Sequence, residues 1–161
     1  MTDNKSKFRI SEERRRILLV EDDIINQEMI RESVSDTYDL IVAETGEEAL
    51  LIIGEQYETL SIVLLDLNLP GIKGIEVLKK IRSVPAYSRL PVIVMTSDSE
   101  AEVECLTLGA IDFIPKPYPA SKVILARILR TVELFENRDI LRFTERDHLT
   151  GMSHKEFFYR Y

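Results

Sequence analysis

Short apolar runs alternate with amphipathic segments between residues 17 and 118. Five such runs stand out, at Ile17–Val20, Leu40–Ala43, Ile62–Leu65, Val92–Met95 and Phe113–Ile114. They lack the alternation of polar and apolar positions that marks a strand with one solvated face. Continuous apolar runs are typical of strands that are covered on both faces of a sheet. The pattern therefore predicts five buried β-strands.

The segments between these runs have the spacing of amphipathic helices. In three of them apolar residues recur along one face, at Ile25, Met29, Ile30 and Val34, at Ile75, Leu78 and Ile81, and at Val103, Leu106 and Ala110. Such spacing is typical of amphipathic helices. Glu47 and Glu48 open a further helix, because acidic side chains suit the positive N-terminal end of a helix. Strands that alternate with helices predict an α/β fold with a doubly wound parallel sheet.

A last helix is expected from Pro119, because proline is favourable in the first turn of a helix. Its apolar positions are Val123, Leu125, Ile128, Leu129, Val132 and Phe135. No Gly or Pro interrupts residues 120–150, so we expect the helix to run past the domain as a linker over residues 136–146.

The composition fits one globular domain with room for a short attachment, since 45% of the 161 residues are hydrophobic and 30% are charged. The single cysteine, Cys105, excludes an internal disulfide, and both histidines, His148 and His154, lie too near the C-terminus for a zinc site in the body. No apolar stretch approaches the roughly 20 residues of a membrane helix or follows the basic N-terminus as in a signal peptide. We expect a cytoplasmic protein that does not enter a membrane.

Charge is distributed unevenly along the chain. The net charge is −7, but residues 17–118 carry seven basic and nineteen acidic side chains, a net charge of −12. A body this acidic disfavours nucleic-acid binding and would attract metal cations or a basic partner. Solubility alone would also explain this charge.

Polar residues at the carboxyl ends of the predicted strands indicate where the chemistry lies. In a parallel sheet these ends meet at one edge, near the point where the strand order reverses. Glu21, Asp22 and Asp66 would bring three carboxylates into one cleft. Two such charges about 4 Å apart repel by up to ~4 kcal/mol, so the cleft favours a cation, and oxygen ligands suit Mg²⁺. Lys116 would add a positive charge and Thr96 a hydroxyl.

A carboxylate, a divalent metal, a lysine and a hydroxyl together make a site for phosphoryl transfer, with Asp66 attacking phosphorus. No Gly-rich phosphate loop is present, so the donor would be a partner protein or a small phosphodonor. Each feature also has a plainer explanation. The acidic trio directly after the first strand, Glu21, Asp22 and Asp23, could be a helix N-cap. Lys116 could be an exposed turn residue, and Thr96 with Ser97 could cap the fourth helix. Their joint position at strand ends favours the phosphoryl-transfer site.

Four motifs resemble the receiver domain of bacterial two-component response regulators: ILLVEDD at 17–23, LLDLNLPGIKG at 64–74, VIVMTSD at 92–98 and GAIDFIPKPY at 109–118. The resemblance covers about residues 17–135. It implies a flavodoxin-like fold with five parallel strands and five helices. It also implies that Asp66 accepts a phosphoryl group from a histidine kinase or a phosphotransfer protein in a Mg²⁺-dependent reaction.

The same resemblance implies roles for six further residues. These are Glu21 and Asp22 as the acidic metal-binding pair, Asn68 as a metal ligand through its backbone carbonyl, Thr96 as the switch hydroxyl, Phe113 as the switch aromatic and Lys116 as the lysine of the site. Of the acidic pair, Asp22 is the expected direct ligand. Two surfaces are open as the interface of a homodimer: the face made by the fourth helix, fifth strand and fifth helix, or a coil through residues 120–145.

The end of the chain resembles a second family. Asp147, Leu149, Thr150 and Gly151, followed by Lys155, Phe157 and Phe158, are similar to the opening of a GGDEF domain, the diguanylate cyclase family. His154 stands where that family usually has Asn, and the Gly-Gly-Asp/Glu-Glu-Phe signature is absent from the sequence.

We therefore expect a polar tail at 1–16, a receiver domain at 17–135, and at 136–161 a helical linker with the start of an output domain. That output domain would continue beyond Tyr161 and would turn over cyclic di-GMP. A stand-alone receiver with a helical tail is the alternative.

The preferred hypothesis is that this chain is a phosphoacceptor switch and not itself an enzyme. One alternative is a receiver-like adaptor that acts by protein–protein interaction and no longer cycles phosphate. The intact set of Asp22, Asp66, Thr96 and Lys116 argues against it. Another is a phosphatase of the haloacid dehalogenase type that uses Asp66, but that chemistry needs an aspartate where Asn68 stands.

Overall fold

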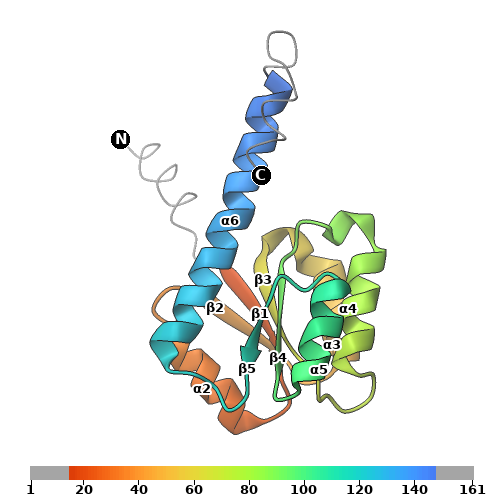
Figure 1. Cartoon of the computed structure of the whole chain (residues 1–161), viewed down its shortest axis with the longest axis vertical. Coiled ribbons are helices and arrows are strands. Elements are labelled where there is room, and N and C mark those ends of the chain that lie inside the picture. Colours follow the sequence, from red (N-terminus) through yellow and green to blue (C-terminus); the bar gives the residue numbers. More distant parts are fainter. Residues whose placement is uncertain (1–14, 148–161) are drawn as a thin grey trace.

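Five parallel strands form one sheet, and helices cover both of its faces (Figure 1). The computed structural model describes residues 15–147, with the side chains of residues 15–136. The strands are β1 (Arg16–Val20), β2 (Asp39–Ala43), β3 (Leu60–Asp66), β4 (Val92–Thr96) and β5 (Asp112–Pro115), in the order β2-β1-β3-β4-β5. The helices are α2 (Ile24–Val34), α3 (Gly46–Gln56), α4 (Gly74–Ser83), α5 (Ser99–Thr107) and α6 (Ser121–Asp147). Over the described residues, this confirms the predicted flavodoxin-like fold.

The apolar runs of the strands supply both halves of the core. In β1, Leu18 and Val20 face the layer formed by α3, α4 and α5, whereas Ile17 and Leu19 face the layer formed by α2 and α6. All four side chains are completely buried. Because each face of the strand has its own helical cover, neither face tolerates a polar residue, and the run shows no alternation. Full burial of one such side chain stabilises the fold by about 1.5–3 kcal/mol.

Helix α2 does not bury all of its regularly spaced apolar side chains. Ile25 and Met29 are 72% and 40% exposed, and two polar residues, Gln27 and Ser33, are buried in their place. Gln27 Nε2 donates to the backbone carbonyl of Glu21 at 2.8 Å, and Ser33 Oγ donates to that of Met29 at 2.9 Å. These hydrogen bonds remove most of the cost of burying polar side chains, so the apolar pattern alone misplaces the buried face.

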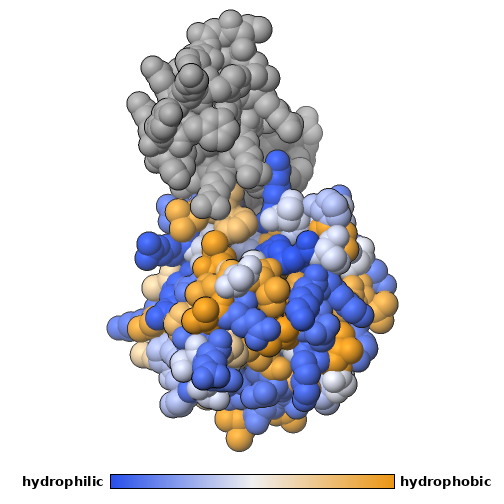
Figure 2. Space-filling model, turned by 45° about the vertical axis from the view of Figure 1, so that its right-hand side comes forward, coloured by the Kyte–Doolittle hydropathy of each residue, from blue (hydrophilic) through white to orange (hydrophobic). Residues whose placement is uncertain are grey.

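Helix α5 also leaves regularly spaced apolar side chains exposed. Val103 and Leu106 are 67% and 43% exposed, and Cys105 is the side chain that this helix buries completely. Ala110 is buried, but it lies after the end of the helix. The exposed apolar side chains of the body are mixed with charged ones on the face seen in Figure 2. Single apolar residues on such a surface are ordinary.

Helix α6 begins at Ser121, two residues after the predicted start at Pro119. Its first turn forms on Ala120, whose carbonyl accepts hydrogen bonds from the amides of residues 123 and 124. Of the predicted apolar positions, Ile128 and Val132 are buried, whereas Val123 and Leu129 are each 41% exposed.

The end of α6 projects beyond the sheet (Figure 1). The helix continues to Asp147 and so includes residues 136–146, whose role as a linker stays a prediction. The GGDEF-like motif after Asp147 and most of the predicted N-terminal tail lie outside the described residues, although Arg16 already begins β1. Within the described part of the chain, no helix is both long enough and apolar enough to cross a bilayer.

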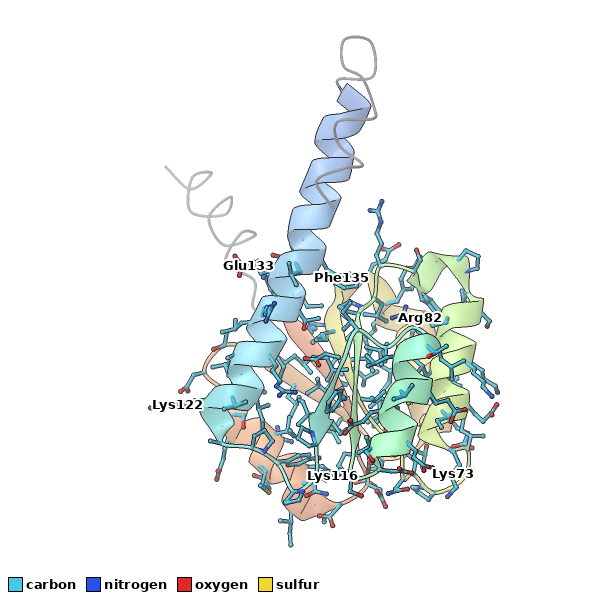
Figure 3. All side chains as sticks on the ribbon, viewed as in Figure 1. Lys73, Arg82, Lys116, Lys122, Glu133 and Phe135 are labelled. Atoms are coloured by element: carbon cyan, nitrogen blue, oxygen red, sulfur yellow. The ribbon has the colours of Figure 1, made fainter. Side chains whose placement is uncertain are left out.

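Arg82, near the end of α4, joins three segments of the chain. Its guanidinium donates to the backbone carbonyls of Tyr87 at 3.1 Å, Leu90 at 2.9 Å and Gly109 at 3.0 Å. In Figure 3 Arg82 lies toward the edge of the sheet opposite Lys116. Burial lowers the pKa of Arg82, but an arginine remains charged at neutral pH. The guanidinium of Arg82 therefore connects α4 to the segment before β4 and to the turn after α5.

Replacing Arg82 by alanine should lower the free energy of unfolding by about 2–4 kcal/mol, because three carbonyls, two of them in partly buried hydrogen bonds, lose a charged donor. Arg82→Lys should recover little, since one ammonium cannot reach carbonyls in separate segments. Urea denaturation measures both variants. Lys80→Ala, at an exposed position of the same helix, should cost less than about 0.5 kcal/mol. Equal stability of Arg82→Ala and this control would refute the structural role.

Candidate functional site

Three carboxylates meet where the strand order reverses. Glu21 and Asp22 follow β1, Asp66 ends β3, and these two strands are neighbours at the centre of the sheet. One carboxylate oxygen from each of the three residues lies within 4.8 Å of the others. Lys116, directly after β5, lies at the same edge (Figure 3). The structure thus brings together the acidic residues and the lysine that the sequence places at strand ends.

The carboxylate of Asp66 is held by two donors. Its Oδ1 lies 2.9 Å from Lys116 Nζ, and the same oxygen accepts a hydrogen bond from the backbone amide of Asn68 at 3.1 Å. The Asp66 side chain is only 3% exposed, and that of Lys116 is 20% exposed. Lys116 is therefore not the exposed turn residue of the plainer explanation.

Glu21 is the most constrained member of the cluster. It is completely buried, and among the described residues neither of its carboxylate oxygens has a hydrogen-bond partner. Lys116 Nζ is 3.5 Å from Oε1. Burial, reinforced by the neighbouring Asp66 carboxylate, raises the pKa of Glu21 to about 8. A buried carboxyl group without a donor is costly, so the site favours a bound cation.

Asp23 separates the two explanations of the acidic trio. Its side chain caps α2 by accepting hydrogen bonds from the amides of Ile25 at 2.8 Å and Asn26 at 3.1 Å. The N-cap explanation is therefore right for Asp23, whereas Glu21 and Asp22 belong to the cluster with Asp66.

The loop after Asp66 folds closely against the end of β3. The amide of Gly74, the first residue of α4, donates to the carbonyl of Leu67 at 3.1 Å. A Cβ on Gly74 would lie 2.6 Å from Leu67 Cα, so this approach requires glycine. Asn68 lies inside the loop and is exposed. The role of its carbonyl as a metal ligand stays a prediction.

Thr96 ends β4 and is 3% exposed. Its Oγ1 accepts a hydrogen bond from the amide of Asp98 at 3.0 Å, and Asp98 in turn caps α5 through the amide of Glu100. Thr96 is therefore not the cap of that helix. As the last residue of β4, it lies at the edge of the sheet that carries the acidic cluster.

Phe113, in β5, is contacted by a residue that the sequence did not single out. The ring is partly buried against the α3, α4 and α5 layer. Arg127, from α6, donates to the carbonyl of Phe113 at 2.6 Å, and its guanidinium carbon lies 5.9 Å from the centre of the ring. No motif marks Arg127, because the contact depends on how α6 crosses β5.

Tyr118 is a second residue that the sequence analysis missed. Lys116 Nζ lies 5.8 Å from the centre of its ring, and its hydroxyl contacts Met95 Sδ at 3.5 Å. Burial, with the nearby Glu21 and Asp66, raises the pKa of Tyr118, so the phenol stays neutral. An aromatic residue two positions after the lysine was the available signal, since a ring can attract a nearby ammonium.

Known proteins of similar sequence place this chain in a family. Residues 17–128 match the family model described as the response regulator receiver domain. The chain is 31% identical over 150 residues to a cyclic di-GMP phosphodiesterase of Thermotoga maritima, an alignment that covers 90% of this chain and 40% of that protein. It is 36% identical over 137 residues to the transcriptional regulatory protein CpxR homolog of Haemophilus influenzae, covering 80% and 58%. The chain therefore spans less than two thirds of the length of both relatives.

Solved structures agree with the sequence match. A CheY-like response regulator receiver domain protein from Methanospirillum hungatei superimposes with a TM-score of 0.68 at 26% identity, covering 78% of this chain and 98% of that one. NtrX from Brucella abortus gives a TM-score of 0.72 at 27% identity, covering 88% and 32%. Since the family model spans most of the chain and the fold and the acidic cluster fit it, this chain belongs to the response regulator receiver family of two-component systems.

Proposed function

We propose that Asp66 is the phosphoacceptor of this receiver and that the acidic cluster holds Mg²⁺. The ion pair of 2.9 Å between Asp66 Oδ1 and Lys116 Nζ, inside a cluster of three carboxylates, carries the proposal. Receiver domains are phosphoacceptor switches that interact with histidine kinases or phosphotransfer proteins. Asp66 and Lys116 lie together at the edge of the sheet where the strand order reverses.

In the transfer step, a carboxylate oxygen of Asp66 attacks the phosphorus of a phosphohistidine on the partner. The new O–P bond forms as the P–N bond breaks, and the imidazole nitrogen keeps the electron pair and takes up a proton. Lys116 is placed to stay beside the negative charge as it spreads onto the phosphoryl oxygens. The amide of Asn68 holds the orientation of the Asp66 carboxylate.

The residues present fit Mg²⁺. The donor set consists of oxygens from Glu21, Asp22 and Asp66, and the proposal adds the backbone carbonyl of Asn68. Among the described residues, the buried carboxylate oxygens of Glu21 have no hydrogen-bond partner, which gives the site a reason to take up a cation. When bound, the metal ion supplies positive charge next to the transferring phosphoryl group.

Thr96 and Phe113 would report the phosphorylated state. Phosphorylation adds about −1.5 to −2 charge and three acceptor oxygens at Asp66. The Thr96 hydroxyl can donate to one of these oxygens, which draws the loop of residues 96–102 inward and frees space for Phe113. The output surface would be the helical face beside β5.

We further propose that the output domain of the whole protein is a cyclic di-GMP enzyme. The resemblance of residues 147–158 to a GGDEF domain favours a cyclase, whereas the relative from Thermotoga maritima is named a phosphodiesterase. The test uses the product of the full coding region, incubated with GTP and separately with cyclic di-GMP. Formation of cyclic di-GMP supports the cyclase, and its hydrolysis supports the phosphodiesterase. The absence of both activities overturns the proposal.

The first prediction for this proposed function concerns the phosphoacceptor. With Mg²⁺ and a small phosphodonor, the wild-type chain should gain the mass of one phosphoryl group, and Asp66→Asn should gain none because the nucleophile is lost. Intact-mass spectrometry measures both. Asp98→Asn, a change at an exposed aspartate near the same edge, should be phosphorylated like the wild type. Phosphorylation of Asp66→Asn at the wild-type level would refute the assignment, and an inert wild type would favour the adaptor.

The second prediction concerns the metal. Asp22→Ala should abolish phosphorylation without unfolding the domain, because it removes an exposed ligand and relieves repulsion in the cluster. A chelator should have the same effect on the wild type. Thermal melting checks the fold, and Glu32→Ala, at an exposed position of α2, serves as the control. Normal phosphorylation of Asp22→Ala would show that Asp22 is not a metal ligand.

The third prediction concerns the switch. Thr96→Ala should still take up phosphate at Asp66, because the hydroxyl reports the phosphoryl group and does not transfer it. Its conformational response should be weaker, which amide exchange of residues 96–118 measures with and without beryllofluoride as a phosphate mimic. If the wild type exchanges identically in both states, the switch assignment fails.

A further inference from the structure

The loop of residues 67–73 connects the proposed phosphoacceptor to α4. It lies at the edge of the sheet that carries Lys116, as the position of Lys73 shows in Figure 3. Leu67 and Leu69 anchor its first half, since they are only 8% and 2% exposed. The backbone carbonyl of Asn68, the proposed metal ligand, lies between these two anchors. The shape of the loop therefore bears directly on the metal site.

A carboxylate from another helix holds the second half of the loop. Glu47, in the first turn of α3, accepts a hydrogen bond at Oε1 from the backbone amide of Ile72 at 3.1 Å. Gly71 has a φ of 75°, and a Cβ there would lie 2.8 and 3.0 Å from the two carboxylate oxygens of Glu47. The carboxylate thus lies directly over Gly71, where any side chain would displace it.

The start of α3 is itself fixed, so Glu47 extends from a rigid turn. Thr45 Oγ1 accepts a hydrogen bond from the amide of Glu48 at 3.1 Å, and Glu48 Oε2 accepts one from the amide of Glu44 at 3.0 Å. This reciprocal arrangement satisfies donors at the helix N-terminus. Glu48 therefore caps its own helix, whereas its neighbour Glu47 reaches across to a loop 25 residues away in sequence.

We propose that Glu47 is a positioning residue for phosphorylation: it holds the loop after Asp66 in the shape that presents the Asn68 carbonyl to the metal. The inference rests on the function proposed for the site and adds a residue to it. Without the Glu47 acceptor, the Ile72 amide would bond to water, and the glycine beside it would allow the loop to sample other shapes. Metal affinity would fall, while the transfer chemistry at saturating metal would change little.

The test compares Glu47→Ala, which removes the acceptor, with Glu47→Gln, which keeps an acceptor oxygen but loses the charge. Glu55→Ala, an exposed glutamate on the same helix, is the matched control. Amide exchange at Ile72 is measured by NMR in the metal-free chain. Mg²⁺ affinity is measured by NMR titration, and phosphorylation rates are measured across a range of Mg²⁺ concentrations.

Glu47→Ala should speed Ile72 exchange and raise the Mg²⁺ concentration for half-maximal phosphorylation about two- to fivefold, with little change in the rate at saturation. Glu47→Gln should recover most of the wild-type values, and Glu55→Ala should match the wild type. If instead both Glu47 variants lose thermal stability equally and bind Mg²⁺ normally, Glu47 only stabilises the end of α3 and the proposal is overturned.

The two proposals fail in different ways. A wild-type chain that takes up no phosphoryl group overturns the function proposed for Asp66. The role of Glu47 is then judged on Ile72 exchange and Mg²⁺ affinity, which need no phosphoryl transfer. Unchanged Ile72 exchange and unchanged Mg²⁺ affinity in Glu47→Ala would overturn the role of Glu47, whether or not the wild type is phosphorylated.

Discussion

Repulsion between carboxylates is the constraint on which the rest of this structure depends. The sheet brings three of them within 4.8 Å, and one, Glu21, is completely buried with no hydrogen-bond donor among the described residues. The ammonium of Lys116, 2.9 Å from Asp66 and 3.5 Å from Glu21, is the counter-charge that makes this arrangement tolerable. Burial, together with the neighbouring Asp66, raises the pKa of Glu21 to about 8, although Lys116 acts in the opposite direction. The pocket is therefore built to gain stability from an added cation.

Much of the neighbouring structure keeps this unfavourable arrangement in place. Apolar strands buried on both faces fix the positions where β1 and β3 end. Around Lys116, the ring of Tyr118 packs near the ammonium. Around Asp66, the amide of Asn68 and the close approach of Gly74 shape the following loop. Glu47 reaches the same loop from α3. Such a surrounding shell is how a site retains groups that would otherwise separate.

The sequence predicts the parts of this protein that depend on local pattern. Continuous apolar runs locate the strands, and polar residues at their ends locate Glu21, Asp66 and Lys116, because parallel strands end at one edge. Which side chains of a helix are buried is predicted less well. The buried side chains of Gln27 and Ser33 donate hydrogen bonds to backbone carbonyls, which no apolar spacing reveals.

Contacts across elements are predicted least of all. The contact of Arg127 with Phe113 depends on how α6 crosses β5, and that of Glu47 with Ile72 depends on how α3 lies beside the loop of residues 67–73. The sequence alone marks Glu47 as a helix-end acid like Glu48.

For helix α6, the packing also has a mechanical consequence. The helix starts near the edge that carries Lys116 and leaves the body on the opposite side (Figure 1). Its 27 residues span about 40 Å. The 15 residues after Val132 extend about 22 Å past the contact with the body, so a tilt of about 10° there would move the far tip by roughly 4 Å. Buried Ile128 and Val132 hold the helix against the body, so a small change of tilt there would become a larger displacement of anything attached at the tip.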